Sequence, residues 1–221
     1  MAESVEKKAH AIMISMPYQG HITPFVGLAL KLASKGMTIT FVHLEYVHHK
    51  LSKANHKSDP FSDARESGLD IRYATISDGF PLDHDRDLHL EKYWTTLLQT
   101  FPSYVDEFVG KLIRSDPQSL HFLVADAVYV WPTTIARKYN LINVSFYTSP
   151  ALVFSLVYHL DLIKHRDDDA EIDYVPGVGS LSSDIRDWMT SLSKSSDISA
   201  SPLVKAFEEV KKADFILQNT V

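Results

Sequence analysis

Three polar residues each follow a short apolar run of the chain and carry side chains suited to proton transfer. They are His21, Asp126 and Thr148, which come after the first, fourth and fifth of these runs. An imidazole accepts a proton near neutral pH, and a carboxylate on its other ring nitrogen can orient it. His21 and Asp126 are therefore candidates for a general base and its orienting group. From position alone, helix capping by these residues is the alternative.

Six short β-rich runs are each followed by a helical pattern, which is the order of βαβ units. The runs are apolar almost throughout rather than alternating, as in strands that helices cover on both faces. The sequence therefore predicts an α/β fold with a doubly wound parallel sheet. The six predicted strands are His10–Ser15, Thr38–His43, Asp70–Thr75, Leu120–Ala125, Ile142–Tyr147 and Asp214–Asn219.

Prolines and glycines mark the expected helix ends. A proline in the first helical position after a polar cap is a typical helix start. This pattern occurs at Thr23-Pro24, Ser149-Pro150 and Ser201-Pro202. The first of these helices is expected to stop at Gly36, and a helix pair with a break near Pro102 is expected over 86–114. Residues 166–200 are expected to form a surface excursion over the sheet's edge.

The polar residues named above would share one location in such a fold. Ligands bind beyond the carboxyl ends of parallel strands, so the loops after the first, fourth and fifth strands would form one crevice. A dinucleotide site would place G-x-G-x-x-G in the first loop, where only Gly20 is present. The sequence also contains no P-loop and no G-x-S-x-G elbow. Nucleotide-cofactor enzymes and α/β-hydrolases are therefore disfavoured.

The composition narrows the function further. Of 221 residues, 45% are hydrophobic and 23% are charged, which is typical of a globular protein. With 22 Lys and Arg against 28 Asp and Glu, the net charge of −6 predicts no binding to nucleic acid or anionic membranes. The absence of cysteine excludes disulfides, thiolate nucleophiles and Cys-based metal sites. The uncharged stretch 139–160 contains asparagine, serine and proline, so a strand, a turn and a helix start are expected rather than a membrane span.

Five short motifs occur in one order along the chain. They are Gly20-His21-Ile22-Thr23-Pro24, Val124-Ala125-Asp126 with Trp131, Phe146-Tyr147-Thr148, Val175-Pro176-Gly177, and Ala213 to Thr220. In this order they resemble the N-terminal half of plant UDP-dependent glycosyltransferases of family 1, and the match covers essentially the whole chain. The resemblance implies a Rossmann-like domain that forms one half of the two-domain GT-B architecture.

The resemblance also implies a reaction and the residues that perform it. In this family the histidine matching His21 removes the proton of an acceptor hydroxyl, and the aspartate matching Asp126 pairs with it. Thr148 and Gly20 match positions expected to contact the donor sugar, with a helix-start hydroxyl as the alternative for Thr148. The implied co-substrate is a UDP-sugar, with glucose expected, and the implied acceptor is a small molecule that carries a hydroxyl. No metal is expected.

Other chemically suggestive side chains have simpler explanations. Four aromatic residues could line an acceptor pocket, although aromatic residues in a sheet protein belong to the core by default; they are Tyr18, Phe80, Tyr129 and Trp188. A group of histidines matches no common zinc spacing, so a solvated helix face is expected for it; it comprises His43, His48, His49 and His56. The acidic run Asp167–Asp169 lacks the glycine and glutamate of a calcium loop and is expected to be solvated.

The family's second domain, which supplies most contacts to the UDP-sugar, has no match in this sequence. Residues 1–221 are therefore expected to form one N-terminal acceptor-binding domain that is inactive alone. Two hypotheses stay open: half of an inverting glycosyltransferase, or a truncated binding or regulatory domain without catalysis. A flavodoxin-like nucleotide-binding protein is a weaker third, because phosphate-binding glycines are lacking. The charged first residues lack the apolar run of a signal peptide, so a cytoplasmic location is expected.

Overall fold

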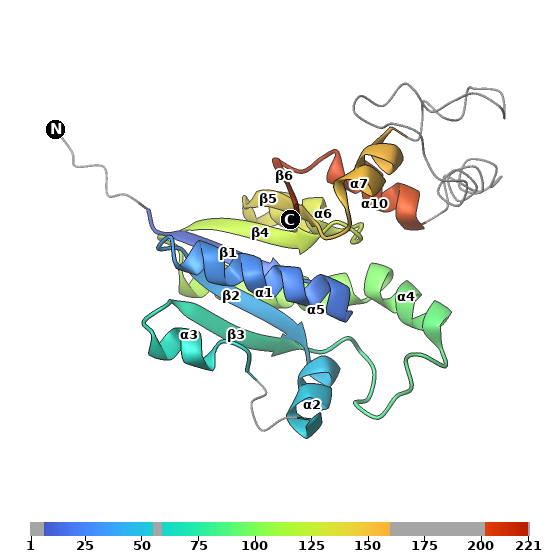
Figure 1. Ribbon diagram of the computed structural model, residues 1–221, viewed down its shortest axis with the longest axis horizontal. Helices are drawn as coiled ribbons and strands as arrows, with labels where there is room; N and C mark the ends of the chain where they lie inside the picture. The colour runs from blue at the N-terminus through green and yellow to red at the C-terminus, as the bar shows by residue number, and fades with distance from the viewer. Residues whose placement is uncertain (1–6, 55–58, 160–201, 221) are drawn as a thin grey trace.

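The computed structural model describes residues 7–54, 59–159 and 202–220. In these residues six strands pair in parallel to form one sheet, in the order β3-β2-β1-β4-β5-β6 (Figure 1). The strands are β1 (Ala9–Ile14), β2 (Thr38–Leu44), β3 (Ile71–Ile76), β4 (Leu120–Asp126), β5 (Ile142–Tyr147) and β6 (Phe215–Gln218). Each begins and ends within one residue of the predicted strand, so the doubly wound parallel sheet is confirmed.

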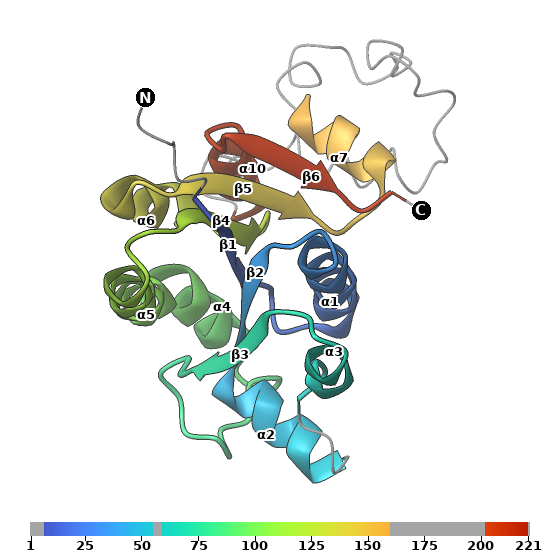
Figure 2. The ribbon, with the colours of Figure 1, turned by 90° about the vertical axis from the view of Figure 1, so that its left-hand side faces the viewer.

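Helices cover both faces of the sheet. Figure 2 shows α4, α5 and α6 on one face and α1 and α3 on the other. The helices described are α1 (Gln19–Ala33), α2 (Glu45–Ala54), α3 (Ser62–Glu66), α4 (Leu90–Gln99), α5 (Phe101–Ser115), α6 (Pro132–Tyr139), α7 (Ala151–Tyr158) and α10 (Pro202–Val210).

The central strand β1 shows why the strands are apolar on both sides. Ala11 and Met13 lie in the core cluster that contains residues of α1. Ile12 and Ile14 lie in the core cluster of the opposite face, which contains residues of α5. Because successive side chains of a strand point to opposite faces, a strand between two helical layers has no position left for a solvated side chain.

The first helix begins earlier than predicted. α1 starts at Gln19, so Pro24 is its sixth residue rather than its first. The backbone N–H of His21 donates to the carbonyl of Tyr18 at 2.9 Å, which forms the first turn before the proline is reached. Pro24 has no N–H, so the carbonyl of Gly20 lacks its usual intrahelical partner. The prediction that Pro24 opens the helix is therefore wrong, and both Gly20 and His21 lie in the first turn of α1.

The remaining helix ends lie close to the prediction. α10 begins at Pro202 as expected, and α7 begins at Ala151, one residue after Pro150. α4 and α5 form the expected helix pair, with Pro102 as the second residue of α5. α1 ends ahead of Gly36, whose φ of 90° lies in the left-handed region that favours glycine. Short-range signals thus located most helix ends correctly.

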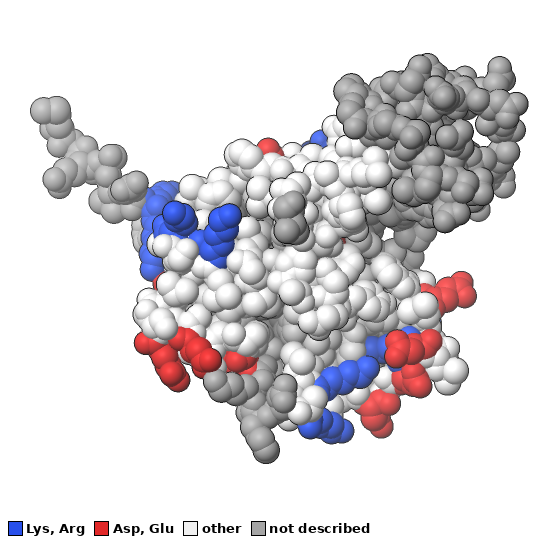
Figure 3. Space-filling model, viewed as in Figure 1, with Lys and Arg blue, Asp and Glu red and all other residues white. Residues whose placement is uncertain are grey.

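Most of the described surface on the face seen in Figure 3 is uncharged, and at its lower right Lys and Arg side chains lie beside those of Asp and Glu. No helix in the described part of the chain is long and apolar enough to cross a membrane. The uncharged stretch that begins at residue 139 divides into the end of α6, β5 and α7, as predicted. The predicted surface excursion over 166–200 lies outside the described residues.

Candidate active site

The predicted pairing of His21 with Asp126 is present at the carboxyl edge of the sheet. β1 and β4 are adjacent and parallel, so Asp126 at the end of β4 lies beside the chain that leaves β1 toward α1. His21 Nδ1 and Asp126 Oδ2 are 2.7 Å apart, although the residues are 105 positions apart in the sequence. This distance is that of a charge-assisted hydrogen bond. The topology therefore assembles the pair.

Asp126 is held in place from several directions. Its side chain is 1% exposed. Besides His21, its Oδ2 accepts a hydrogen bond from the backbone N–H of Met16, and its Oδ1 accepts one from that of Val128, both at 3.2 Å. These donors offset part of the cost of burying a charged carboxylate. A fixed carboxylate that only accepts hydrogen bonds keeps the proton of His21 on Nδ1.

The other ring nitrogen of His21 is available for chemistry. The side chain is 24% exposed, and Nε2 makes no hydrogen bond to any residue that the structure describes. With its proton on Nδ1, a neutral imidazole presents a lone pair on Nε2. The pair can therefore take a proton from a hydroxyl group placed at Nε2.

The two residues predicted to contact a donor sugar flank this pair. Thr148 follows β5, and its Oγ1 lies 3.1 Å from His21 Nδ1, a contact that the sequence did not predict. Gly20 is exposed in the first turn of α1, and a Cβ added to it would meet nothing within 4 Å. Packing thus does not require glycine at this position. The donor-sugar contacts of Thr148 and Gly20 stay predictions.

An aromatic wall extends from His21 toward α4. The ring of Tyr18 lies 6.4 Å from that of His21 and stacks on Trp94 with ring centroids 6.0 Å apart. Burial raises the pKa of Tyr18, and Asp87 adds to the effect, so its hydroxyl stays neutral at physiological pH. Tyr18 therefore lies beside the candidate base, and its contact with an acceptor stays a prediction. Trp94 is a neighbour that the sequence did not point to.

A pocket of about 470 Å³ lies beside α4, within the range of roughly 300–1,000 Å³ that is usual for small-molecule sites. Its lining residues are Glu91, Trp94, Thr95, Leu98, Gln99, Val130 and Lys205. Because Trp94 stacks on Tyr18, the pocket is linked through two aromatic rings to His21. It is the candidate acceptor pocket of the described residues.

Phe80 lies in the loop between β3 and α4. Its ring stacks on His84 with centroids 4.5 Å apart and planes 5° apart. A buried ion pair between Arg86 and Asp78 joins two positions of the same loop. Arg86 Nε donates to Asp78 Oδ2 at 2.7 Å, and Nη2 donates to Oδ1 at 3.0 Å. Such a two-point contact fixes both side chains. The sequence did not predict this ion pair, because a spacing of eight residues within a loop carries no local signal.

Tyr129 belongs to the core, which corrects its prediction as an acceptor-lining residue. It is 1% exposed, and its ring packs against Phe101 and Trp131. Its hydroxyl donates to the carbonyl of Ser15 at 3.1 Å. The aromatic ring fills the space under the β4–α6 connection, so no small molecule can reach it. The fourth predicted aromatic residue, Trp188, lies outside the described residues, as does the acidic run at 167–169.

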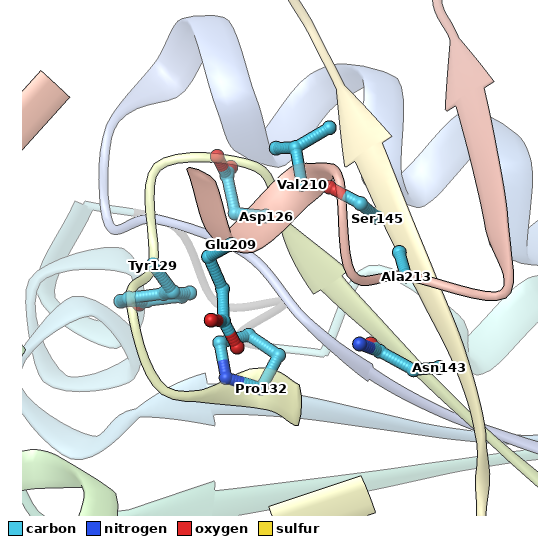
Figure 4. A pocket seen from close by; sticks show the side chains of 8 residues that line it. All are labelled: Asp126, Tyr129, Pro132, Asn143, Ser145, Glu209, Val210 and Ala213. Carbon is cyan, nitrogen blue, oxygen red and sulfur yellow. The ribbon is translucent and has the colours of Figure 1, made fainter. Parts of the chain in front are cut away.

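A second cavity borders Asp126 and is shown in Figure 4. Its volume of about 10 Å³ is that of a single water molecule. In Figure 4 the carboxylates of Asp126 and Glu209 point in different directions. Glu209 Oε1 accepts a hydrogen bond from the backbone N–H of Thr133 in the first turn of α6 at 2.7 Å. This cavity is too small for a substrate. The residues that line it belong to the packing behind Asp126.

The histidine group predicted to be a solvated helix face is partly buried. His43 lies in β2, is 3% exposed, and has its Nδ1 3.3 Å from the hydroxyl of Tyr73. Burial lowers the pKa of His43 to about 4, and His48 adds to the effect. The prediction is therefore wrong for His43, because β2 is covered on both faces. His56 lies outside the described residues.

Comparison with known proteins identifies the relatives of this fold and site. No family model matches the chain. The chain is 46% identical to UDP-glycosyltransferase 86A1 of Arabidopsis thaliana, in an alignment that covers 100% of this chain and 48% of that protein. It is 45% identical to UDP-glycosyltransferase 86A2 of the same species, over 96% of this chain and 45% of that protein. Over this half, the chain belongs to the plant UDP-glycosyltransferase family.

More distant relatives agree with this assignment. The (R)-mandelonitrile beta-glucosyltransferase of Prunus dulcis is 30% identical over 97% of this chain and 47% of that protein. The chain thus spans about half the length of the curated relatives that it matches.

Solved structures of plant glycosyltransferases share the fold. The crystal structure of UDP-glucose: anthocyanidin 3-O-glucosyltransferase in complex with UDP matches with a TM-score of 0.70 at 21% identity, over 98% of this chain and 48% of that chain. The structure of Os79 from O. sativa in complex with U2F and trichothecene matches with a TM-score of 0.69 at 22% identity, over 95% of this chain and 47% of that chain. The predicted Rossmann-like sheet of an N-terminal GT-B half is confirmed.

Proposed function

We propose that this chain is the half of an inverting UDP-glycosyltransferase that binds the acceptor and supplies the catalytic base. The observation that carries the proposal is the geometry of His21, whose Nδ1 is bonded to Asp126 at 2.7 Å while its Nε2 stays unbonded among the described residues. The family relationship supports a sugar transfer as the reaction that needs this base. The aromatic wall of Tyr18 and Trp94 beside it supports a small-molecule acceptor.

In the proposed reaction, His21 Nε2 takes the proton of an acceptor hydroxyl while the acceptor oxygen bonds to the anomeric carbon of the sugar. The bond from that carbon to the diphosphate oxygen breaks, and its electron pair leaves with UDP. Attack opposite to the leaving group inverts the anomeric carbon. A hydroxyl is a weak nucleophile at neutral pH, so the base is required. Asp126 stabilises the imidazolium that forms and keeps the productive tautomer.

The proposed donor is UDP-glucose. Two relatives are named glucosyltransferases, and a solved structure of the same fold is named UDP-glucose: anthocyanidin 3-O-glucosyltransferase. These names support this choice of sugar. No metal ion takes part in the proposed transfer, so a chelator should leave the reaction rate unchanged. The cytoplasmic location expected from the sequence also stays a prediction, which a fluorescent fusion of the complete protein tests.

The test compares two proteins. One is the 221-residue chain alone, and the other is a chimera that joins it to the part of UDP-glycosyltransferase 86A1 that it does not match. Each is incubated with UDP-glucose and a panel of small alcohols and phenols, and glycosides and released UDP are measured by mass spectrometry. We expect product from the chimera only, because a donor not held beside His21 loses a positioning advantage worth up to roughly 7–11 kcal/mol.

Two outcomes would contradict the proposal. Transfer by the chain alone would require a donor site within these residues and would refute the assignment as one half of the enzyme. A chimera that folds and binds UDP, yet neither transfers glucose nor hydrolyses UDP-glucose, would favour the alternative of a binding or regulatory domain without catalysis.

A further inference from the structure

A cluster of two histidines and one aspartate lies at the amino edge of the sheet, opposite to the candidate active site. His10 near the start of β1 and His121 near the start of β4 are direct neighbours in the strand register, and Asp116 lies in the turn between α5 and β4. His10 Nδ1 is 2.9 Å from Asp116 Oδ2. His121 Nε2 is 3.6 Å from the same oxygen. The three ligand atoms all lie within 4.8 Å of one another.

The histidines of this cluster are buried, and one of their nitrogens is unsatisfied. The side chains of His10 and His121 are 0% and 6% exposed, whereas that of Asp116 is 25% exposed. His121 Nε2 has no hydrogen-bond partner among the described residues. Buried polar atoms are nearly always bonded, and the 3.6 Å from His121 Nε2 to the Asp116 oxygen exceeds a hydrogen-bond distance, so this nitrogen is left to bind a ligand. A cation between His121 Nε2 and Asp116 would bond all three side chains.

Thr40 on β2 allows His10 to act as a ligand. The Oγ1 of Thr40 lies 2.8 Å from His10 Nε2. If Nε2–H donates to Thr40, the lone pair of Nδ1 faces Asp116, and this outer hydrogen bond is the usual feature of a metal-binding histidine. If the Thr40 hydroxyl donates instead, Nδ1–H bonds directly to Asp116 and no cation is needed. The two states therefore differ in the tautomer of His10.

We propose that His10, Asp116 and His121 form a binding site for Zn²⁺ or a similar divalent transition-metal ion. Two imidazoles and a carboxylate are a ligand set that suits Zn²⁺. Metal–ligand distances of about 2.0–2.2 Å in a tetrahedral site put ligand atoms roughly 3.3 Å apart. The observed separations of 2.9 and 3.6 Å lie on either side of that value. Bound metal would cross-link β1 to β4 and to the turn that precedes β4, so it would stabilise the fold without taking part in sugar transfer.

The experiment titrates Zn²⁺ into the chain, purified without a histidine tag and stripped with a chelator, by calorimetry. We expect one Zn²⁺ per chain, a higher melting temperature in the presence of Zn²⁺, and a visible absorption band when Co²⁺ is used instead. Asp116→Asn should lower the Zn²⁺ affinity at least tenfold. Thr40→Val should lower it by about 10–100-fold, whereas Thr40→Ser, which keeps the hydroxyl, should retain it.

Control variants decide between this site and adventitious binding. His49→Gln removes a partly exposed histidine outside the cluster, on α2, and should leave the Zn²⁺ affinity unchanged. The melting temperature of each metal-free variant shows that it is folded, and the two Thr40 variants keep all three ligands in place. Absent binding in the wild-type chain would overturn the proposal. Equal Zn²⁺ affinity in the wild-type chain, Asp116→Asn and Thr40→Val would also overturn it.

Discussion

Two histidine–aspartate pairs lie at opposite ends of the same two neighbouring strands. His21 and Asp126 meet at the carboxyl ends of β1 and β4, with 2.7 Å between Nδ1 and the carboxylate. His10 and Asp116 meet near the amino ends, with 2.9 Å between the equivalent atoms. Distance and atom type therefore do not distinguish the two pairs.

Their surroundings do distinguish them. The side chain of His21 is 24% exposed, and its Nε2 makes no hydrogen bond to a described residue. The side chain of His10 is 0% exposed, and its Nε2 is bonded to Thr40. A histidine can act as a base toward a substrate only if its second nitrogen can reach that substrate. The nitrogen without a partner, rather than the carboxylate contact, therefore marks the candidate catalytic pair.

The largest expected effect follows from removing the exposed imidazole. In the chimera, His21→Ala should lower turnover by roughly 10²–10⁴-fold, because a general base contributes about that much to a proton-transfer step. Acceptor affinity should change little. Steady-state rates and acceptor titration measure both quantities. His49→Ala removes a histidine from α2 and serves as the control. Wild-type turnover in His21→Ala would show that the base is another group.

Replacing the buried carboxylate of the same pair tests the role of orientation. Asp126→Asn keeps the shape of the side chain but can no longer hold the Nδ1–H tautomer of His21. Turnover in the chimera should fall on the order of 10²-fold or more, by analogy with the same change in a catalytic triad. The control is Glu107→Gln, which makes the same chemical change at an exposed residue of α5. If the rates of Asp126→Asn and Glu107→Gln were both unchanged, Asp126 would have no positioning role.

The pH dependence of stability tests the cost of burying histidine. Burial lowers the pKa of His10 and lowers that of His43 to about 4. Between the unfolded value of 6.5 and the folded value, only the unfolded chain takes up these protons, so stability falls as the pH falls. For His43 the loss between pH 6.5 and pH 4 is roughly 3 kcal/mol. Urea unfolding of the wild-type chain and of His43→Gln at several pH values measures it. If the free energy of unfolding of the two proteins changed with pH in the same way, burial of His43 would not be a cause of the pH dependence.

The smallest effect is expected at the pair of His10 and Asp116. With a chelator present, Asp116→Asn should lower the free energy of unfolding by about 1–3 kcal/mol, because hydrogen bonds from His10 and Ser119 to a charged acceptor are weakened. Urea unfolding of the chain alone measures this change. Glu107→Gln should change the stability by less than about 0.5 kcal/mol, because its ion pair with Lys111 is exposed to solvent. If Asp116→Asn were as stable as the wild-type chain, the hydrogen bonds from His10 and Ser119 to Asp116 would not contribute to the stability of the fold.

The strands, most helix ends and the sheet edge shared by His21 and Asp126 could be predicted from the order of residues along the chain. The strands follow from short apolar runs, which are a local property of the chain. The shared location of His21 and Asp126 follows from one rule, that the carboxyl ends of parallel strands meet at one edge of the sheet. Both inferences use only the order of elements, and side-chain packing is not needed for them. The pairing of the two side chains is implied by the family resemblance, because position alone leaves helix capping open.

Which aromatic and histidine side chains are buried is visible only in the folded chain. Tyr129 fills the core under the β4–α6 connection while Tyr18 lies beside His21, although both follow strands that end at the same edge. His43, expected on a solvated face, is enclosed because β2 lies between two helical layers. Burial depends on what other segments of the chain cover a residue, so local pattern cannot fix it.

The cluster at the amino edge shows the same limit most clearly. His10, Asp116 and His121 come from two strands and a turn, and their spacing matches no metal-ligand pattern, so the sequence predicted no metal site. The parallel pairing of β1 with β4 makes the two histidines neighbours. The end of α5 then places Asp116 within 2.9 Å of His10. Contacts between groups this far apart in sequence are set by the register of the sheet and the length of the preceding helix, and only the folded chain combines the two.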